Sequence, residues 1–163
     1  MTQEPNSGSP TAERVRLASM DDLMPLIRER LAAGQSVKLS PRGVSMRPML
    51  REGLDSVTLS QPPTRLKKYD IPLYLREDGT YVLHRVVRVG ETYTCIGDNQ
   101  FVKEHGIPHE RVIAVVTAFT RGGKSRSVGA ISYRIYCRFW HFTRFPRRAY
   151  RGVIRRVRRL FRK

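Results

Sequence analysis

Short hydrophobic stretches separated by turn-forming residues make up the middle of the chain. These stretches are rich in Val, Ile, Leu and Tyr, which is typical of β-strands. They predict six strands, at residues 36–40, 55–60, 71–75, 81–89, 93–96 and 112–120. The pair Asp78-Gly79, between the third and fourth stretches, indicates a tight hairpin. The pattern therefore predicts a mainly β body, and short strands with regular turns favour a small, coiled and partly open barrel.

A helical pattern precedes the first predicted strand. Its hydrophobic residues recur at a spacing that places them on one face, namely Leu23, Leu26, Ile27 and Leu31. Asp21 or Asp22 can cap the start of such a helix, Pro25 fits its first turn, and Gly34 can end it. We expect this N-terminal helix to pack on the β body.

A second helical pattern occupies the C-terminal residues 149–163. Its hydrophobic residues share one face, namely Tyr150, Val153, Ile154, Val157, Leu160 and Phe161. Arg and Lys cover the remaining positions, so these residues predict a basic amphipathic helix. Pro146 breaks or restarts the helix that the preceding stretch, 131–145, can form.

The positive charge is concentrated in the same part of the chain. The formal net charge is +17, and residues 121–163 contain 15 Lys/Arg and no Asp/Glu. Residues 1–120 are nearly neutral, with 16 Lys/Arg and 14 Asp/Glu. This asymmetry indicates an anionic partner. The amphipathic pattern of residues 149–163 favours an anionic membrane surface, with nucleic acid as the alternative.

Length and composition indicate one domain with extended termini. We expect a disordered N-terminus at residues 1–17, a β domain at 18–120 and a basic tail at 121–163. Cys95 and Cys137 lack the spacing of a disulfide framework or a zinc site. The first residues carry no apolar leader, and the best apolar run, 112–119, is far shorter than the ~20 residues of a membrane-spanning helix. We therefore expect a cytoplasmic protein, peripheral on the inner face of the membrane.

Ser45 lies in the sequence Gly-Val-Ser-Met-Arg-Pro-Met-Leu, residues 43–50, directly after a predicted strand. Gly43 permits a close backbone approach, and Pro48 restricts the exit from the turn. A serine on a rigid corner can act as a nucleophile beside backbone N–H groups. His84 and Asp98 lie at the edges of strand-like segments, and such a set can converge as nucleophile, base and orienting carboxylate. An ordinary turn serine is the alternative.

Four segments of the chain resemble the signal peptidase I superfamily of serine peptidases, the S24/S26 group. Residues 43–50 resemble its nucleophile box, and residues 68–74 its central strand, with Tyr69 in place of a glycine. Val-Leu-His-Arg-Val-Val at 82–87 resembles the His-Arg-Val box, and Gly-Asp-Asn-Gln at 97–100 resembles the Gly-Asp-Asn box. The segments occur in the family's order, and the resemblance covers about residues 37–120.

Within that superfamily the chain is similar to the Ser-His-Asp branch of archaea and the endoplasmic reticulum, because His84 stands where other members carry lysine. The resemblance implies that Ser45 is the nucleophile, His84 the base and Asp98 the carboxylate that orients the imidazole. The branch has a further acidic residue six positions later, where this chain departs from aspartate and carries Glu104. We interpret Glu104 as a loop residue with a supporting role at most.

The resemblance implies a serine endopeptidase that cuts an extended peptide or precursor protein, with small residues before the cut, through an acyl-enzyme. Gly43 would support the site by shaping the turn, and Met46 by packing near the substrate-binding surface. Two alternatives stay open: a non-catalytic peptidase-like module that binds an anionic membrane surface or nucleic acid, and a LexA-like self-cleaving regulator. The second is weakened by the missing lysine and by the lack of an obvious helix-turn-helix. Both branches are usually membrane-anchored, which the expected cytoplasmic location does not match.

Three histidines could in principle bind zinc, namely His84, His105 and His109. Gly106 and Pro108 disfavour the helix that would align the last two. We therefore expect neither a metal nor a cofactor.

Overall fold

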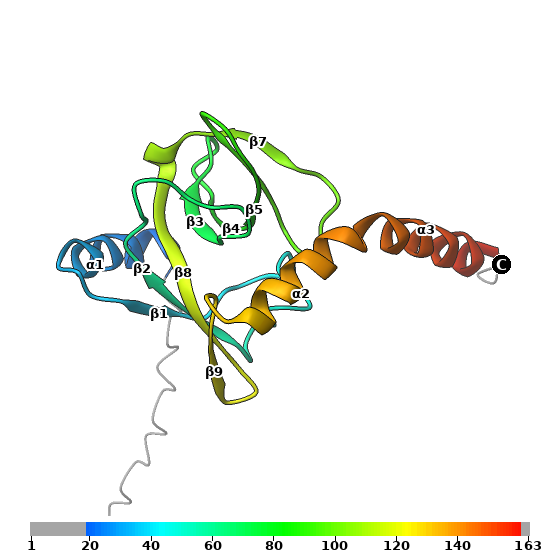
Figure 1. Cartoon of the computed structure of the whole chain (residues 1–163), viewed down its shortest axis with the longest axis horizontal. Coiled ribbons are helices and arrows are strands. Elements are labelled where there is room, and N and C mark those ends of the chain that lie inside the picture. Colours follow the sequence, from blue (N-terminus) through cyan, green and yellow to red (C-terminus); the bar gives the residue numbers. More distant parts are fainter. Residues whose placement is uncertain (1–18, 161–163) are drawn as a thin grey trace, which may run out of the picture.

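The computed structural model describes residues 19–160 (Figure 1). The predicted disordered N-terminus, residues 1–17, and Phe161 of the predicted C-terminal helix lie outside the described residues. The elements are, in chain order, α1 (Met20–Ala32), β1 (Val37–Leu39), β2 (Ser56–Ser60), β3 (Pro72–Leu75), β4 (Tyr81–Leu83), β5 (Arg85–Val89), β6 (Tyr93–Ile96), β7 (Glu104–Ile107), a 3₁₀ turn (His109–Arg111), β8 (Val112–Arg121), β9 (Lys124–Ser127), α2 (Ile131–Phe142) and α3 (Arg144–Leu160).

The strands form two antiparallel sheets. The first has the order β1-β2-β8-β3-β4, with β9 paired to β8, and the second has the order β5-β6-β7. The prediction of a mainly β body is confirmed, although the two sheets do not close into one barrel. The predicted hairpin is also confirmed: β3 pairs with β4 across Asp78-Gly79, and Gly79 adopts a φ of +80°.

The predicted strand at 81–89 is divided between the two sheets. β4 ends at Leu83 in the first sheet, and β5 begins at Arg85 in the second. His84 lies at this crossing and is 1% exposed. Side chains from both sheets can therefore approach the His84 ring.

Two short strands carry no alternation of hydrophobic and polar residues and were not predicted. β7 pairs with β6, which places Glu104 opposite Cys95. β9 pairs with β8 after a two-glycine turn in which Gly122 and Gly123 have φ values of +56° and +77°. Both strands are edge strands; β9 is exposed throughout and β7 buries only Ile107, so pairing with an existing strand stabilises them.

The N-terminal helix packs as predicted, although three details differ. Pro25, predicted in the first turn, lies inside the helix, which begins at Met20. Ser19 is the N-cap, in a reciprocal capping box with Asp22. Met24 is buried and Leu26 is 52% exposed, so the buried face differs by one position from the predicted one. The buried residues of α1 join the larger of two hydrophobic clusters, which lies against the first sheet.

The second helix belongs to the folded body. Tyr133 and Cys137 of α2 are buried in the same cluster as Met49 and Phe119. α2 therefore adds buried residues to the core that residues 18–120 begin, although the prediction assigned it to the basic tail at 121–163. The Arg-rich composition of α2 concealed this, since only one narrow face of the helix is buried.

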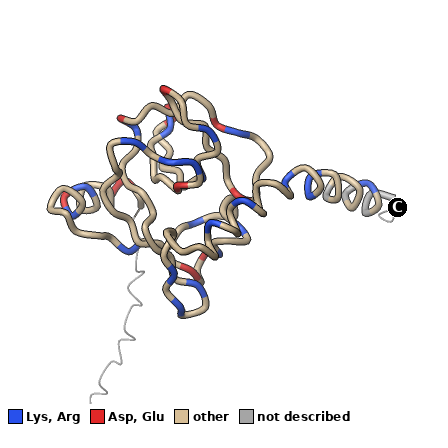
Figure 2. Tube along the Cα trace, viewed as in Figure 1, with Lys and Arg blue, Asp and Glu red and all other residues tan. Residues whose placement is uncertain are grey.

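The third helix extends away from the body (Figure 1). It begins at Arg144 and holds Pro146 in its first turn, where the missing N–H is not needed. Lys and Arg recur along α2 and α3 (Figure 2). None of the helices in the described part of the chain has the length and apolarity needed to cross a membrane.

Candidate active site

Ser45 lies on a tight turn that is anchored by its neighbours. Gly43 has a φ of +85°, a conformation that glycine adopts without strain. Met46, Met49 and Leu50 are buried in the core, whereas Ser45 itself is half-buried. The buried neighbours therefore anchor the turn in the core, while Ser45 remains partly accessible to solvent.

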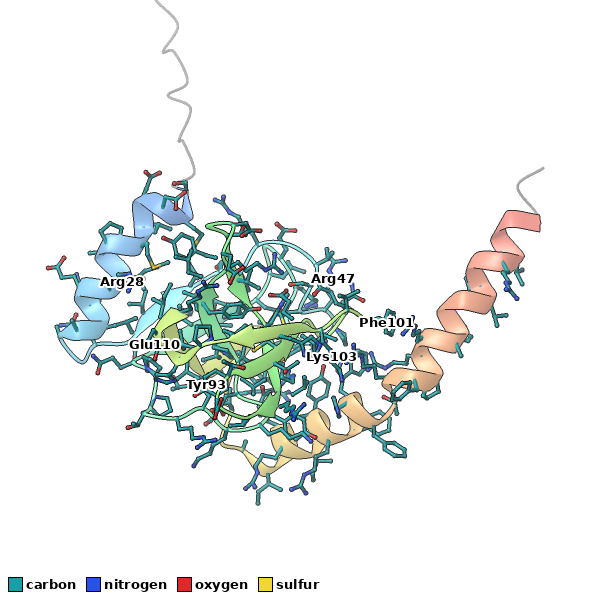
Figure 3. All side chains as sticks on the ribbon, turned by 90° about the horizontal axis from the view of Figure 1, so that it is seen from above. Arg28, Arg47, Tyr93, Phe101, Lys103 and Glu110 are labelled. Atoms are coloured by element: carbon teal, nitrogen blue, oxygen red, sulfur yellow. The ribbon has the colours of Figure 1, made fainter. Side chains whose placement is uncertain are left out.

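The predicted Gly-Asp-Asn turn packs directly against this serine turn. The Asn99 backbone N–H donates to the Ser45 carbonyl at 2.8 Å, and the Asn99 side chain donates to the Val44 carbonyl at 3.1 Å. A Cβ atom on Gly97 would lie 2.7 Å from the Ser45 carbonyl oxygen. Glycine at position 97 is therefore required for the close approach of the two turns. Figure 3 shows Arg47 of the serine turn and Phe101, just after the second turn, on the same side of the body.

His84 is bound on one side by a carboxylate. Its Nδ1 atom lies 3.0 Å from Glu104 Oε1 and 3.4 Å from the Tyr74 hydroxyl. Tyr74 also donates to Glu104 Oε2, and Arg76 donates to both oxygens of the same carboxylate. Because a carboxylate only accepts hydrogen bonds, this arrangement assigns the imidazole proton to Nδ1 and leaves Nε2 as a proton acceptor.

The electrostatics favour a neutral imidazole beside an ionised carboxylate. Burial lowers the pKa of His84, and the attraction of Glu104 offsets part of this effect. Burial raises the pKa of Glu104, but the hydrogen bonds from Arg76 and Tyr74 outweigh it, so this pKa lies below its ordinary value. The pair therefore has the charge state that a general base requires near neutral pH.

Ser45 and His84 line the same pocket, which has a volume of about 210 Å³. Gly43, Met46 and Arg76 contribute to its walls. Among the described residues no hydrogen bond joins Ser45 to His84, and such contacts commonly tighten only when substrate binds. A larger groove of about 870 Å³ lies beside it and shares Arg76 and Gln100 with the pocket.

Asp98 has a different partner from the predicted one. Its two oxygens accept hydrogen bonds from Arg85 at 2.8 and 2.7 Å, in a pair whose side chains are 2–3% exposed. The carboxylate in contact with His84 is Glu104. Among the described residues no hydrogen bond joins Asp98 to His84, which differs from the prediction that Asp98 orients the imidazole, because both Asp98 oxygens bond to Arg85.

The Arg85–Asp98 pair connects the serine turn to α2. Arg85 donates to the Tyr133 hydroxyl at 2.7 Å and contacts Cys137 Sγ at 2.9 Å and Met49 Sδ at 3.0 Å. The Asp98 carbonyl accepts from the Trp140 indole at 3.0 Å. A buried charge needs such a complete set of partners. This network is structural, and it holds the wall of the site in place.

Glu104 is the carboxylate that contacts His84, a contact that the sequence did not predict. It lies on β7, and pairing with β6 brings it next to the His84 crossing. The available signal was its position six residues after Asp98, where the resembled branch carries its further acidic residue. The short strand Glu-His-Gly-Ile was interpreted as a loop, and that interpretation is wrong.

The other two histidines considered as zinc ligands, His105 and His109, do not contact His84. His105 Nδ1 lies 3.4 Å from the Thr94 hydroxyl, and His109 Nδ1 lies 2.9 Å from the Tyr93 hydroxyl. Within residues 19–160, the structure brings together no group of three or more His, Cys, Asp or Glu side chains that could hold a metal ion.

Comparison with known proteins adds no relative: neither a protein-family model nor a curated protein sequence matches this chain.

Proposed function

We propose that the protein is a serine endopeptidase in which Ser45 is the nucleophile and His84, oriented by Glu104, is the general base. The observation that carries the proposal is the contact of 3.0 Å between His84 Nδ1 and Glu104 Oε1, beside the pocket that Ser45 also lines. A serine, a neutral imidazole and an ionised carboxylate are the groups that acyl transfer requires. The resemblance of four segments to the signal peptidase I superfamily supports the same reaction.

In the proposed reaction His84 Nε2 removes the Ser45 hydroxyl proton while Oγ attacks the scissile carbonyl. The imidazolium that forms is stabilised by Glu104, and it then donates the proton to the leaving amine. The Ser45 backbone N–H contributes to the oxyanion hole. Water hydrolyses the acyl-enzyme by the same steps in reverse order. Arg76 and Tyr74 keep Glu104 ionised and in place throughout.

The proposed substrate is an extended peptide segment. The groove beside the pocket offers space for it, and its wall includes Tyr74, Phe101 and Ile107 among charged residues. The half-buried Ser45 stands where an extended chain could pass from the pocket into the groove. The resemblance adds an expectation of small residues before the cut.

The test is cleavage of a library of extended peptides by the purified full chain, in the presence of lipid vesicles. Cleavage should disappear in Ser45→Ala and in His84→Ala. Ser125→Ala, on the exposed strand β9, and His109→Ala serve as matched controls and should retain activity.

Each contrary result favours another function. Cleavage that persists in Ser45→Ala would refute the proposal. No cleavage by a folded protein would favour a non-catalytic module. Discrete fragments of the chain itself, absent in Ser45→Ala, would favour a self-cleaving regulator.

A further inference from the structure

α2 has two hydrophobic faces, and only one is buried. Tyr133 and Cys137 point into the core, with exposed fractions of 7% and 1%. The opposite side carries Ile131, Ile135, Phe139 and Phe142, which are 76%, 62%, 63% and 84% exposed. Their spacing of four, four and three residues places them in one stripe along the helix. A stripe of large apolar side chains this exposed indicates a partner.

The exposed hydrophobic residues continue along α3. Phe145, Tyr150, Val153 and Val157 are exposed by 80%, 67%, 60% and 44%. The last three recur at helical spacing and form one stripe. We call the exposed hydrophobic residues of the two helices the α2–α3 apolar face, which consists of Ile131, Ile135, Phe139, Phe142, Phe145, Tyr150, Val153 and Val157.

The surroundings of this face are strongly cationic. Residues 121–163 contain 15 Lys/Arg and no acidic residue. The basic positions recur along both helices, whereas acidic positions are confined to the rest of the body (Figure 2). The partner must therefore be anionic as well as able to accept apolar side chains.

We propose that the α2–α3 apolar face inserts into the headgroup region of an anionic phospholipid bilayer, with both helices lying along its surface. Acyl chains accept the exposed Phe, Ile and Val side chains, and the flanking arginines contact lipid phosphates. Nucleic acid would satisfy the arginines but leave the apolar stripes in water. A second copy of the chain would cover the stripes but bring two strongly cationic surfaces together.

The proposal goes beyond the peptidase activity and does not depend on it. It extends the membrane surface expected for residues 149–163 to α2, which is part of the folded body. Because Tyr133 bonds to Arg85 and Trp140 bonds to the Asp98 carbonyl, α2 is fixed to the wall of the candidate active site. A bilayer that binds α2 would therefore hold the whole folded body at the membrane surface, whereas a bilayer that binds only residues 149–163 would hold the tail.

The experiment is co-sedimentation of the full chain with vesicles of phosphatidylcholine alone or of phosphatidylcholine mixed with phosphatidylglycerol. We expect binding to the mixed vesicles that weakens as salt is added. The α2 variant Phe139→Ser/Phe142→Ser should lose at least about tenfold in affinity for the mixed vesicles, because both side chains lose their apolar contacts with the bilayer. Val153→Ser/Val157→Ser tests α3 in the same way.

Leu54→Ser removes a side chain that is 70% exposed elsewhere on the molecule and should bind like the unchanged protein. Urea unfolding of every variant verifies that the body is intact. Ser45→Ala should also bind normally, which separates this proposal from the proposed activity.

Three results would overturn the proposal. The first is unchanged vesicle binding in both double variants. The second is binding to a DNA or RNA duplex that is tighter than to the mixed vesicles and insensitive to the serine substitutions. The third is a lipid-free dimer that Phe139→Ser/Phe142→Ser dissociates.

Discussion

Substitution of Gly97 by alanine should damage both stability and the candidate site. A Cβ atom at this position would lie 2.7 Å from the Ser45 carbonyl oxygen and 3.0 Å from the Gln100 side-chain oxygen. Gln100 can rotate away, but the Ser45 carbonyl is backbone and is held by the Asn99 N–H at 2.8 Å. The serine turn or the 97–100 turn must therefore move.

The size of the effect follows from that contact. Ordinary van der Waals distance begins near 3.4 Å, so the two turns must separate by 0.7 Å. Overpacking of this kind costs about 1–3 kcal/mol. The hydrogen bond from Asn99 to Ser45 would lengthen at the same time, which costs about 1 kcal/mol more. We expect the free energy of unfolding to fall by about 2–4 kcal/mol in total.

Urea unfolding measures this change directly. With a slope of about 2 kcal/mol/M, the midpoint should fall by about 1–2 M. Where peptide cleavage is detected, it should fall by about a hundredfold, because the nucleophile moves by most of an ångström. Gly90→Ala is the matched control, since its Cβ atom would lie 3.5 Å from the Thr92 carbonyl oxygen in ordinary contact. A Gly97→Ala protein as stable as Gly90→Ala would refute the close approach of the two turns.

Four further predictions follow from the contacts and the backbone geometry around the site. Glu104→Gln should lower the pKa of His84, because the attraction that favours its charged form is removed, whereas Asp98→Asn should change this pKa much less; NMR titration measures both. Burial lowers the pKa of His84 below the ordinary value of about 6.5, so the contribution of the neutral imidazole to stability should be complete above pH 6.5 and decline as the pH falls through the lowered pKa. Peptide cleavage should rise with pH through the same pKa. Cleavage that rises only above pH 8 would exclude His84 as the base. Arg85→Met should destabilise by about 3–5 kcal/mol in urea unfolding because it leaves a buried carboxylate unpaired, and Arg85→Met/Asp98→Asn should recover part of the loss. Tyr69 has a φ of +80°, so Tyr69→Gly should be about 1 kcal/mol more stable than Tyr69→Ala, which loses the same ring but keeps the strain; equal stability would contradict this.

The sequence predicts those parts of the fold that depend on local hydrophobic pattern. The strand at Tyr93–Ile96 follows from its β-forming composition, and the hairpin at Asp78-Gly79 follows from its turn chemistry. The division of residues 81–89 at His84 does not, since both halves contain β-forming residues and only tertiary packing separates the two sheets. β7 and β9 are edge strands that together bury one residue, Ile107, so no periodicity marks them.

Only those residues of the candidate site that have a distinctive local sequence could be predicted. Ser45 and His84 could be selected from their local sequences, and the structure places both on one pocket. Which of Asp98 and Glu104 contacts His84 depends on which carboxylate pairs with Arg85. That pairing follows from the register of the second sheet. The sequence did not indicate that the side chain of Arg85, a charged residue directly after His84, would be buried in the core.

The most direct measurement is peptide mapping by mass spectrometry after the protein reacts with a serine-directed fluorophosphonate. The proposed function predicts a covalent adduct on Ser45 in the unchanged protein and in His109→Ala. It predicts no adduct in Ser45→Ala and a greatly reduced rate of labelling in His84→Ala and Glu104→Gln. An adduct on another residue, or labelling of Ser45 at the same rate without His84, would contradict the assignment of Ser45, His84 and Glu104 as nucleophile, base and orienting carboxylate.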